Sequence, residues 1–326
     1  MSWENIFQKL PLAHVARDYP LTYVDIGVRN GFQRDLSPLA FSTHVVGFEP
    51  EPNEFERIKG LSDGAWASRR VLPHAISPDG GSARLHVTRD QDAASLLKPI
   101  DGVGEKYGKT QFFDIEHTIT VPTLTLPDAL EESGLSSMDY LKIDIEGAEF
   151  KVFQSAEELL GETLVIKTEA CYLPVRDGQG LVWEIDAFLG EKGFVLMDID
   201  RPAHWRREGY DLHPFISDQS PPYARGQLVH GDFLYFRDAG SLDDRIEPLI
   251  KLGLLAMSFG YFDHAMMAFE RPPVRGYLAD TYNLSVEDVV IPASRMYGRR
   301  AFFHAFRETL MRSAGFVRRL PKGLFS

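Results

Sequence analysis

The stretch Tyr23-Val24-Asp25-Ile26-Gly27-Val28-Arg29-Asn30-Gly31, followed by Val45-Val46-Gly47-Phe48-Glu49-Pro50, decides the fold. The first segment predicts a strand that runs into a glycine turn and a helix start. The second predicts a strand that ends in a carboxylate. A nucleotide-type cofactor needs these features, because glycines let the backbone approach it and a carboxylate accepts both ribose hydroxyls. Together the two segments predict a cofactor-binding part of a parallel sheet.

The spacing of the glycines distinguishes between cofactors. Residues 25–31 read D-x-G-x-x-x-G, whereas a pyrophosphate cofactor uses G-x-G-x-x-G to sit on a helix N-terminus. The Asp before the first glycine would repel phosphate but suits a cationic ligand that carries an amino acid, a description that fits S-adenosylmethionine. The pattern therefore favours a methyltransferase over the competing interpretation, an NAD-dependent oxidoreductase.

Composition limits the partners and the compartment. The 35 basic and 47 acidic residues give a net charge of −12, which argues against nucleic acid as the main partner. Ser220-Pro221-Pro222-Tyr223 resembles a signature of adenine methyltransferases, but it lies far downstream of the predicted central strand, and we interpret it as a turn. A single cysteine, Cys171, the lack of a secretory signal and the lack of a long apolar segment predict a cytoplasmic protein.

Strands alternate with helices along most of the chain, which predicts a doubly wound, mostly parallel α/β sheet. Strands are expected at residues 23–27, 43–48, 71–77, 140–145 and 164–169, and an antiparallel strand at 232–237. Residues 89–117 are irregular and predict a loop or lid. We divide the chain into a lead-in helix at 1–20, an α/β domain at 21–238 and a C-terminal helical extension at 239–326.

The strongest single motif is Asp139-Tyr140-Leu141-Lys142-Ile143-Asp144-Ile145-Glu146-Gly147-Ala148-Glu149. With the two segments quoted first, it resembles the FkbM family of S-adenosylmethionine-dependent methyltransferases. Smaller stretches at residues 72–81, 94–96 and 121–130 match in the same order, and the resemblance covers residues 21–238. It implies a seven-stranded, Rossmann-like class I methyltransferase fold. It also implies methylation of a hydroxyl oxygen on a sugar, glycan or natural-product acceptor.

The resemblance further implies roles for individual residues. Three residues of the glycine turn would hold the methionine part of the cofactor: Asp25, Gly27 and Gly31. Glu49 would bind the ribose, and the loop with His74 and Ala75 would surround the adenine. Asp144 and Glu146 would lie where the methyl group meets the acceptor. At position 29 an arginine replaces the usual residue of the family, and Arg29 could pair with the carboxylate of the cofactor.

Methyl transfer to oxygen requires alignment of the reactants and removal of the hydroxyl proton. Three interpretations remain open. A carboxylate such as Asp144 or Glu146 could be the base, or Lys142 could be if burial lowers its pKa, although an ion pair between Lys142 and Asp144 is the simpler role. Alternatively, Asp144 and Glu169 could hold Mg²⁺, which binds hard oxygen ligands and would acidify the hydroxyl.

The segment from Arg295 to Lys322 is basic and contains phenylalanines at intervals. It predicts a charged helix that either packs on the domain or docks on an acidic partner or an anionic membrane surface. The competing functional interpretation is a non-catalytic methyltransferase fold whose helical C-terminus binds a partner. The sequence leaves the oligomeric state open.

Overall fold

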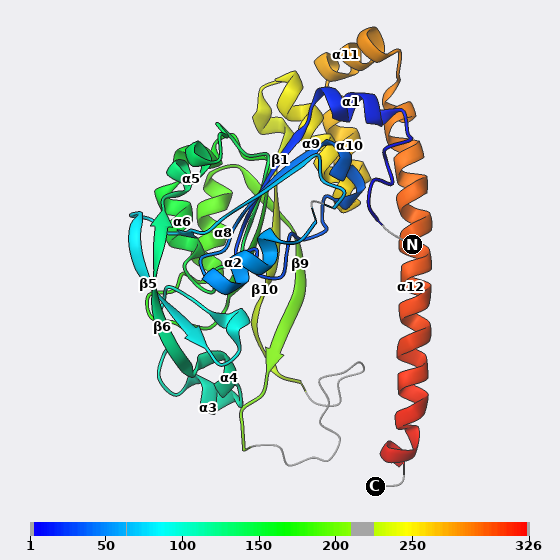
Figure 1. Ribbon diagram of the computed structural model, residues 1–326. Coiled ribbons are helices and arrows are strands. Elements are labelled where there is room, and N and C mark those ends of the chain that lie inside the picture. Colours follow the sequence, from blue (N-terminus) through cyan, green and yellow to red (C-terminus); the bar gives the residue numbers. More distant parts are fainter. Residues whose placement is uncertain (1–2, 63, 210–224, 325–326) are drawn as a thin grey trace.

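The computed structural model of the protein describes residues 3–62, 64–209 and 225–324, with side chains described as far as residue 314. The turn predicted at residues 220–223 lies outside them. Within the described residues, seven strands form a main sheet in the order β3-β2-β1-β7-β8-β10-β9. All neighbours are parallel except β10, which is antiparallel to β8 and β9. The predicted doubly wound, mostly parallel sheet is therefore confirmed (Figure 1). The strands of this sheet are β1 (Leu21–Ile26), β2 (Thr43–Phe48), β3 (Ser68–Leu72), β7 (Tyr140–Ile143), β8 (Val165–Cys171), β9 (Phe194–Trp205) and β10 (Gln227–Arg237).

The segment 71–77, predicted as one strand, is divided between two sheets. Its beginning belongs to β3, whereas Ala75–Ile76 forms β4 in a small second sheet of order β4-β6-β5. Pro73 lies between them and cannot donate a ladder hydrogen bond, which explains the break. The other two strands of the small sheet are β5 (Gly81–Thr88) and β6 (Ile115–Leu124).

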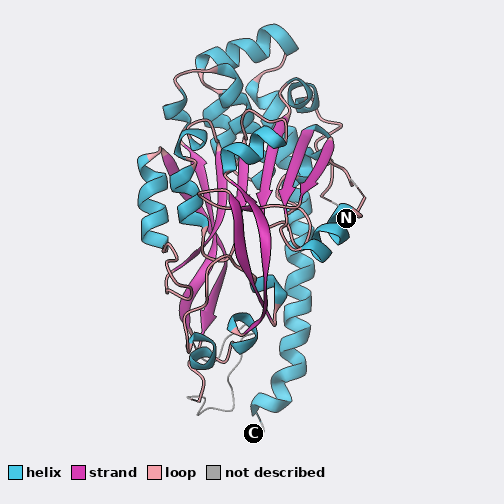
Figure 2. Ribbon diagram, turned by 60° about the vertical axis from the view of Figure 1, so that its left-hand side comes forward, coloured by secondary structure: helices cyan, strands magenta, loops and turns pink. Residues whose placement is uncertain are grey.

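One face of the main sheet is covered by the helices that connect its central strands (Figure 2). Their apolar side chains meet those of Val24, Leu141 and Ile166 in one buried cluster. This first layer is formed by α5 (Leu126–Glu132), α6 (Glu149–Ser155), α7 (Glu157–Leu160) and α8 (Val182–Glu191). Shorter elements precede it: η1 (Ser37–Ser42), α2 (Pro52–Lys59), η2 (Gln91–Ala93), α3 (Val103–Tyr107) and α4 (Thr110–Phe113). The predicted lid at 89–117 therefore contains three short helices.

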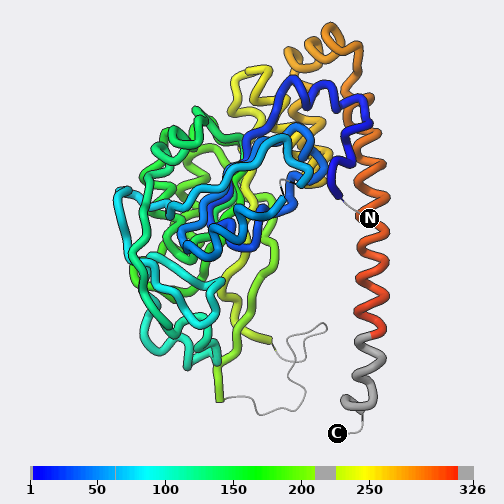
Figure 3. The backbone as a smooth tube through the Cα atoms, viewed as in Figure 1, coloured from blue at the N-terminus to red at the C-terminus, as the bar shows by residue number. Residues whose placement is uncertain are grey.

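The opposite face is covered by the two ends of the chain. Leu249 and Leu255 of the C-terminal helices share a buried cluster with Tyr23 and Tyr140 of the central strands. Strands of a parallel sheet need apolar cover on both faces, and here the C-terminal extension supplies it. Figures 1 and 3 show the N-terminal segment beside these helices. The second layer consists of α1 (Leu12–Asp18), η3 (Ala239–Leu242), α9 (Ile246–Phe259), α10 (Phe262–Phe269), α11 (Pro272–Tyr282) and α12 (Val286–Leu324).

The lead-in helix is shorter than the predicted segment 1–20. The helix α1 begins after Pro11, whose missing N–H and fixed φ suit a helix start and not a helix interior. Among the described residues, no helix combines the length and the apolar character needed to cross a membrane.

Candidate active site

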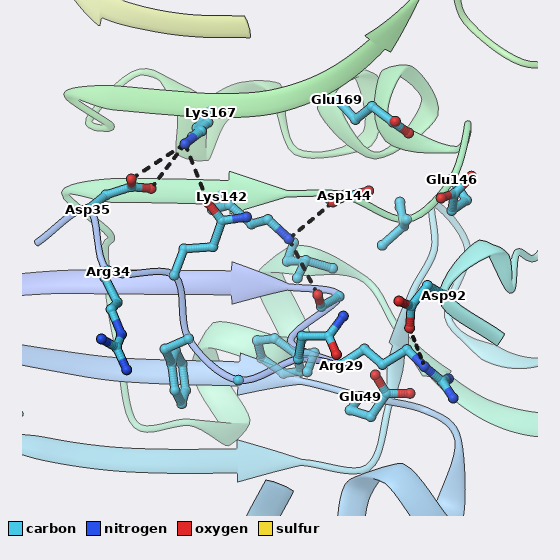
Figure 4. A pocket seen from close by; sticks show the side chains of 18 of the residues that line it. Arg29, Arg34, Asp35, Glu49, Asp92, Lys142, Asp144, Glu146, Lys167 and Glu169 are labelled. Atoms are coloured by element: carbon cyan, nitrogen blue, oxygen red, sulfur yellow. Dashed lines mark hydrogen bonds and ion pairs between the residues drawn. The ribbon is translucent and has the colours of Figure 1, made fainter. Parts of the chain in front are cut away.

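A cavity of about 870 Å³ lies at the carboxyl edge of the main sheet, where β1, β2, β7 and β8 end. Its volume is in the range of pockets that hold cofactors. One part is lined by the glycine turn, by Glu49 and by the loop that contains η2. The other part is lined by residues of β8 and β9 and of the C-terminal helices. We refer to them as the glycine-turn part and the helical part of the cavity. Figure 4 shows Lys167 and Glu169 of β8 among the lining residues.

Two glycines shape the turn that follows β1. Gly27 and Gly31 have φ values of 87° and 85°, which side-chain-bearing residues rarely adopt. A Cβ atom on Gly27 would lie 2.0 Å from the backbone oxygen of Asp144, whereas a Cβ on Gly31 would have its nearest neighbour at 4.0 Å. Gly27 is therefore required for close approach of two backbones as well as for its conformation.

Lys142 lies beneath the turn, opposite Asp25 in the register of β1 and β7. Its Nζ atom is 3.4 Å from Asp25 Oδ1 and 3.5 Å from Asp144 Oδ2, and it donates to the Gly27 carbonyl at 3.3 Å. Burial alone would lower the pKa of Lys142, but the two carboxylates outweigh burial and raise it above its ordinary value. These contacts favour the ion-pair role of Lys142, in which its positive charge holds the two strand ends together, and its role as a base stays a prediction.

Asp25 is placed differently from the prediction. It is fully buried, accepts a hydrogen bond from Tyr23 at 2.6 Å, and does not belong to the described lining of the cavity. Direct contact between Asp25 and a cofactor is not supported by this placement. We expect Asp25 to act through Lys142, whose side chain does line the cavity.

Glu49 lines the glycine-turn part, although its residue surface is only 3% exposed. One carboxylate oxygen accepts from the backbone N–H of Glu51 at 2.9 Å. Burial raises the pKa of Glu49 to about 7, against the effect of that hydrogen bond. Arg29 lies close by and bridges to the η2 loop, with Nε 3.2 Å from Asp92 and a hydrogen bond to Gln91 of 2.7 Å (Figure 4). Pairing of Arg29 with a cofactor carboxylate stays a prediction.

The predicted adenine loop also reaches the cavity. His74 and Ala75 both belong to its lining. The Nδ1 atom of His74 is buried and makes no hydrogen bond among the described residues, but it lies 3.9 Å from Glu132 Oε1 of α5.

The acidic residues that follow β7 lie in different environments. Asp144 lines the cavity, whereas Glu149 folds back and accepts hydrogen bonds from the backbone N–H groups of Ile145 and Gly147. Glu149 is therefore part of the scaffold of the turn. Burial raises its pKa to about 7 despite these hydrogen bonds.

Glu146 also lines the cavity and adopts an unusual backbone conformation for a glutamate, with φ of 61°. The buried side chain of Arg176 holds it through an ion pair of 2.5 Å and a hydrogen bond from Nε to the Glu146 carbonyl of 2.6 Å. Arg176 also donates to the Ala93 carbonyl at 2.9 Å, which links the acidic turn to η2. Sequence reasoning missed Arg176 because it comes from a loop 30 residues away with no recognisable spacing.

Glu169 extends from β8 into the cavity next to Asp144. Oxygen atoms of Asp144, Glu149 and Glu169 lie within 4.8 Å of one another. The predicted proximity of Asp144 and Glu169 is thus present, although no ion is included in the structure. Glu169 also contacts His230 of β10, whose Nδ1 atom is 2.6 Å away. The sequence indicated no role for His230, since the contact depends on the antiparallel pairing of β10 with β8.

Lys167 lies in the helical part and repeats the arrangement of Lys142 one strand further along. The two lysines are register partners across β7 and β8. The Nζ atom of Lys167 is 3.4 Å from Asp35 and 3.5 Å from Asp200. A lysine directly after the apolar residues Val165 and Ile166 of a predicted buried strand was the one signal that could have identified it. Further lining comes from the C-terminal helices and the segment before α1, in the form of Trp3, Ser258, Phe259, Tyr261 and Tyr297.

The strand order and a cavity at the carboxyl edge, with a glycine turn and an acidic residue after β2, define a Rossmann-like, nucleotide-cofactor class of fold. Within that class, the chain belongs to the family described as "Methyltransferase FkbM domain", whose model matches residues 25–196. The predicted family is therefore confirmed.

Two curated relatives are similar over about half of this chain. The 2-O-methyltransferase NoeI from Sinorhizobium fredii (strain NBRC 101917 / NGR234) is 29% identical over 164 residues, which are 48% of this chain and 65% of that protein. The methyltransferase sdnD from Sordaria araneosa is 25% identical over 191 residues, which are 52% of this chain and 70% of that protein. Among solved structures, the magnesium protoporphyrin IX methyltransferase ChlM from Synechocystis PCC 6803 covers 69% of this chain and 74% of its own, with 10% identity and a TM-score of 0.32. That likeness is too distant to carry any inference here.

Proposed function

We propose that the protein is an S-adenosylmethionine-dependent O-methyltransferase whose acceptor is a hydroxyl of a sugar, glycan or natural product. One observation carries the proposal: a single cavity joins a glycine turn and a buried carboxylate, Glu49, to a polar region that contains Asp144 and Glu169. Membership of the FkbM family supports the transfer chemistry. The similarity to NoeI, which is named a 2-O-methyltransferase, supports oxygen as the acceptor atom.

The residues of the glycine-turn part fit the cofactor. Gly27 lines this part of the cavity, and Glu49 has a carboxylate of which one oxygen accepts a backbone hydrogen bond. His74 lines the same cavity. When bound, S-adenosylmethionine supplies an electrophilic methyl group for in-line displacement by an oxygen nucleophile. We assign ribose binding to Glu49 and the surroundings of the adenine to His74 and Ala75.

The proton of the acceptor hydroxyl must pass to a group in the cavity. Two carboxylates near Lys142 favour its charged form, so we assign this step to the adjacent carboxylates Asp144 and Glu169. Burial and its acidic neighbours raise the pKa of Glu169 well above its ordinary value. Glu146, held by Arg176, positions the loop between the two parts of the cavity.

The carboxylates of Asp144 and Glu169 are also hard oxygen ligands of the kind that Mg²⁺ takes. If they hold this ion, it would acidify the acceptor hydroxyl. Activity that persists in excess EDTA would assign both residues to proton transfer. Activity that EDTA removes and Mg²⁺ restores would assign them to a metal site.

The acceptor would bind in the helical part. Tyr261 and Tyr297 offer aromatic faces and hydroxyls, while Asp198 and Asp200 offer carboxylates. Burial and the nearby carboxylates of Asp198 and Asp200 raise the pKa of Tyr261 to about 12. Aromatic rings beside hydrogen-bonding groups suit a ligand with apolar C–H faces and several hydroxyls. The C-terminal helices would thus contribute to acceptor recognition as well as to the cover of the sheet.

The test is calorimetric titration of the wild-type protein with S-adenosylmethionine and, separately, with NAD. We expect the methyl donor to bind and NAD not to bind. Glu49→Gln should weaken binding about 100-fold or more, because two charge-assisted hydrogen bonds are weakened. Glu56→Gln, a change at an exposed site on α2, is the control and should bind like wild type. If neither S-adenosylmethionine nor its demethylated product binds, the non-catalytic interpretation replaces the proposal.

A further inference from the structure

Residues 299–314 of α12 run beside the body of the protein (Figures 1 and 3). The first half of the same helix is anchored, because Val286, Val289, Val290 and Ala293 are buried in the core. Between residues 299 and 314, the large apolar side chains are exposed to solvent. They are Phe302 (66%), Phe303 (57%), Phe306 (55%), Leu310 (55%) and Met311 (55%). We call residues 299–314 the exposed half of α12.

Three of these side chains form a face of their own. Phe302, Phe306 and Leu310 follow one another at intervals of four residues, so they lie above one another on the helix. At about 100° per residue, this face is turned by more than 90° from the face that Val289 and Ala293 bury in the core. The exposed phenylalanines therefore do not simply continue the packing of the first half, and the expectation that they pack on the domain is wrong.

Charge is divided between this helix and the rest of the chain. Residues 295–326 contain eight basic residues and one acidic residue, Glu308. Residues 1–294 contain the remaining 27 basic and 46 acidic residues. A net-positive helix on a strongly acidic protein is complementary to an anionic surface. Two copies of the helix packed together would instead bring their arginines, such as Arg299 and Arg307, near one another.

We propose that the exposed half of α12 docks the protein on an anionic phospholipid bilayer. The helix lies in the plane of the headgroups, with Phe302, Phe306 and Leu310 inserted and Arg307, at the side of that face, at the phosphates. Aromatic and aliphatic side chains combined with arginines are the composition of interfacial helices. The acidic body is repelled by the same surface, so the helix is the part that makes contact. This docking does not depend on the proposed methyl transfer.

The test is flotation of the full chain with vesicles of two compositions, phosphatidylcholine alone and phosphatidylcholine mixed with phosphatidylglycerol. The variant F302S/F306S removes the centre of the apolar face. The matched control, W183S/M267S, removes two equally exposed apolar side chains from other helices. Circular dichroism and thermal melting of both variants show that each retains the wild-type fold.

We expect wild type and W183S/M267S to float with the anionic vesicles at low salt and to dissociate as salt is added. F302S/F306S should bind the anionic vesicles at least about tenfold more weakly than wild type. Failure of the wild type to bind anionic vesicles would overturn the proposal, as would equal binding of F302S/F306S. Equal binding to neutral vesicles would refute the electrostatic part. A dimer in size-exclusion chromatography that F302S/F306S abolishes would assign this face to a second copy of the chain.

Discussion

Alanine at position 27 should damage the site far more than alanine at position 31, although both glycines have positive φ. A left-handed conformation costs an L-residue about 1–2 kcal/mol, and this cost applies to Gly27→Ala and Gly31→Ala alike. The difference lies in the neighbours. At Gly27 the new Cβ would be 2.0 Å from the Asp144 oxygen and 3.1 Å from its carbonyl carbon, whereas at Gly31 the nearest atom is a leucine methyl at 4.0 Å.

The contact at Gly27 cannot be relieved by a side-chain rotation, because the obstructing atoms belong to backbone. Asp144 donates its N–H to the carbonyl of Ile26 at 3.0 Å, so its peptide is fixed to β1. To bring the new Cβ and the Asp144 oxygen to an ordinary contact distance, the ends of β1 and β7 would have to move apart by more than about 1 Å. Overpacking of this kind costs about 1–3 kcal/mol or more. We expect a total loss of roughly 3–5 kcal/mol for Gly27→Ala and about 1–2 kcal/mol for Gly31→Ala.

Urea denaturation measures the loss of unfolding free energy for both variants, and calorimetry measures the affinity for S-adenosylmethionine. Gly27→Ala should lose measurable cofactor binding, whereas Gly31→Ala should retain binding within about tenfold of wild type. If both variants lose the same stability and bind equally well, close approach of the two backbones at Gly27 is not what the site requires.

Three further changes test the supporting groups. Lys142→Met leaves the carboxylate of Asp25 buried without its partner and should lower the unfolding free energy by about 3–5 kcal/mol in urea denaturation. The double variant Lys142→Met/Asp25→Asn should recover part of this loss. A double variant less stable than Lys142→Met alone would contradict the ion-pair role. Burial raises the pKa of Glu149 from 4.5 to about 7, so the folded protein keeps a proton that the unfolded chain releases. The unfolding free energy should therefore fall by at most about 3 kcal/mol as the pH rises from 4.5 to about 7, and it should stay lower above that range. Glu149→Gln should flatten this part of the plot of unfolding free energy against pH. An unchanged plot would show that another group titrates. Arg176→Met frees Glu146 and should lower kcat at least tenfold in a transfer assay; a normal kcat with weakened cofactor binding would move Arg176 to the cofactor site.

Local sequence was sufficient for the strands that carry the cofactor turn and for the turn itself. Positive φ at Gly27, a carboxylate after β2 and an acidic run after β7 all follow from residues adjacent in the chain. Strand ends and turns can be predicted from adjacent residues, because the backbone conformation of a residue depends mainly on its neighbours in the chain. The close pairing of Asp144 with Glu169 was also predictable, since adjacent parallel strands end at the same edge.

Only the tertiary structure decided which partners surround these groups. Asp25 lies beneath Lys142 and not in the cavity, Arg176 holds Glu146, and His230 contacts Glu169 through the antiparallel strand β10. Sequence patterns also did not predict that the C-terminal helices cover the second face of the sheet, or that they line the cavity. These contacts join segments from 30 to more than 100 residues apart, and their geometry depends on how whole layers pack. A hydrophobic pattern states that a helix buries one face, but not which sheet it covers.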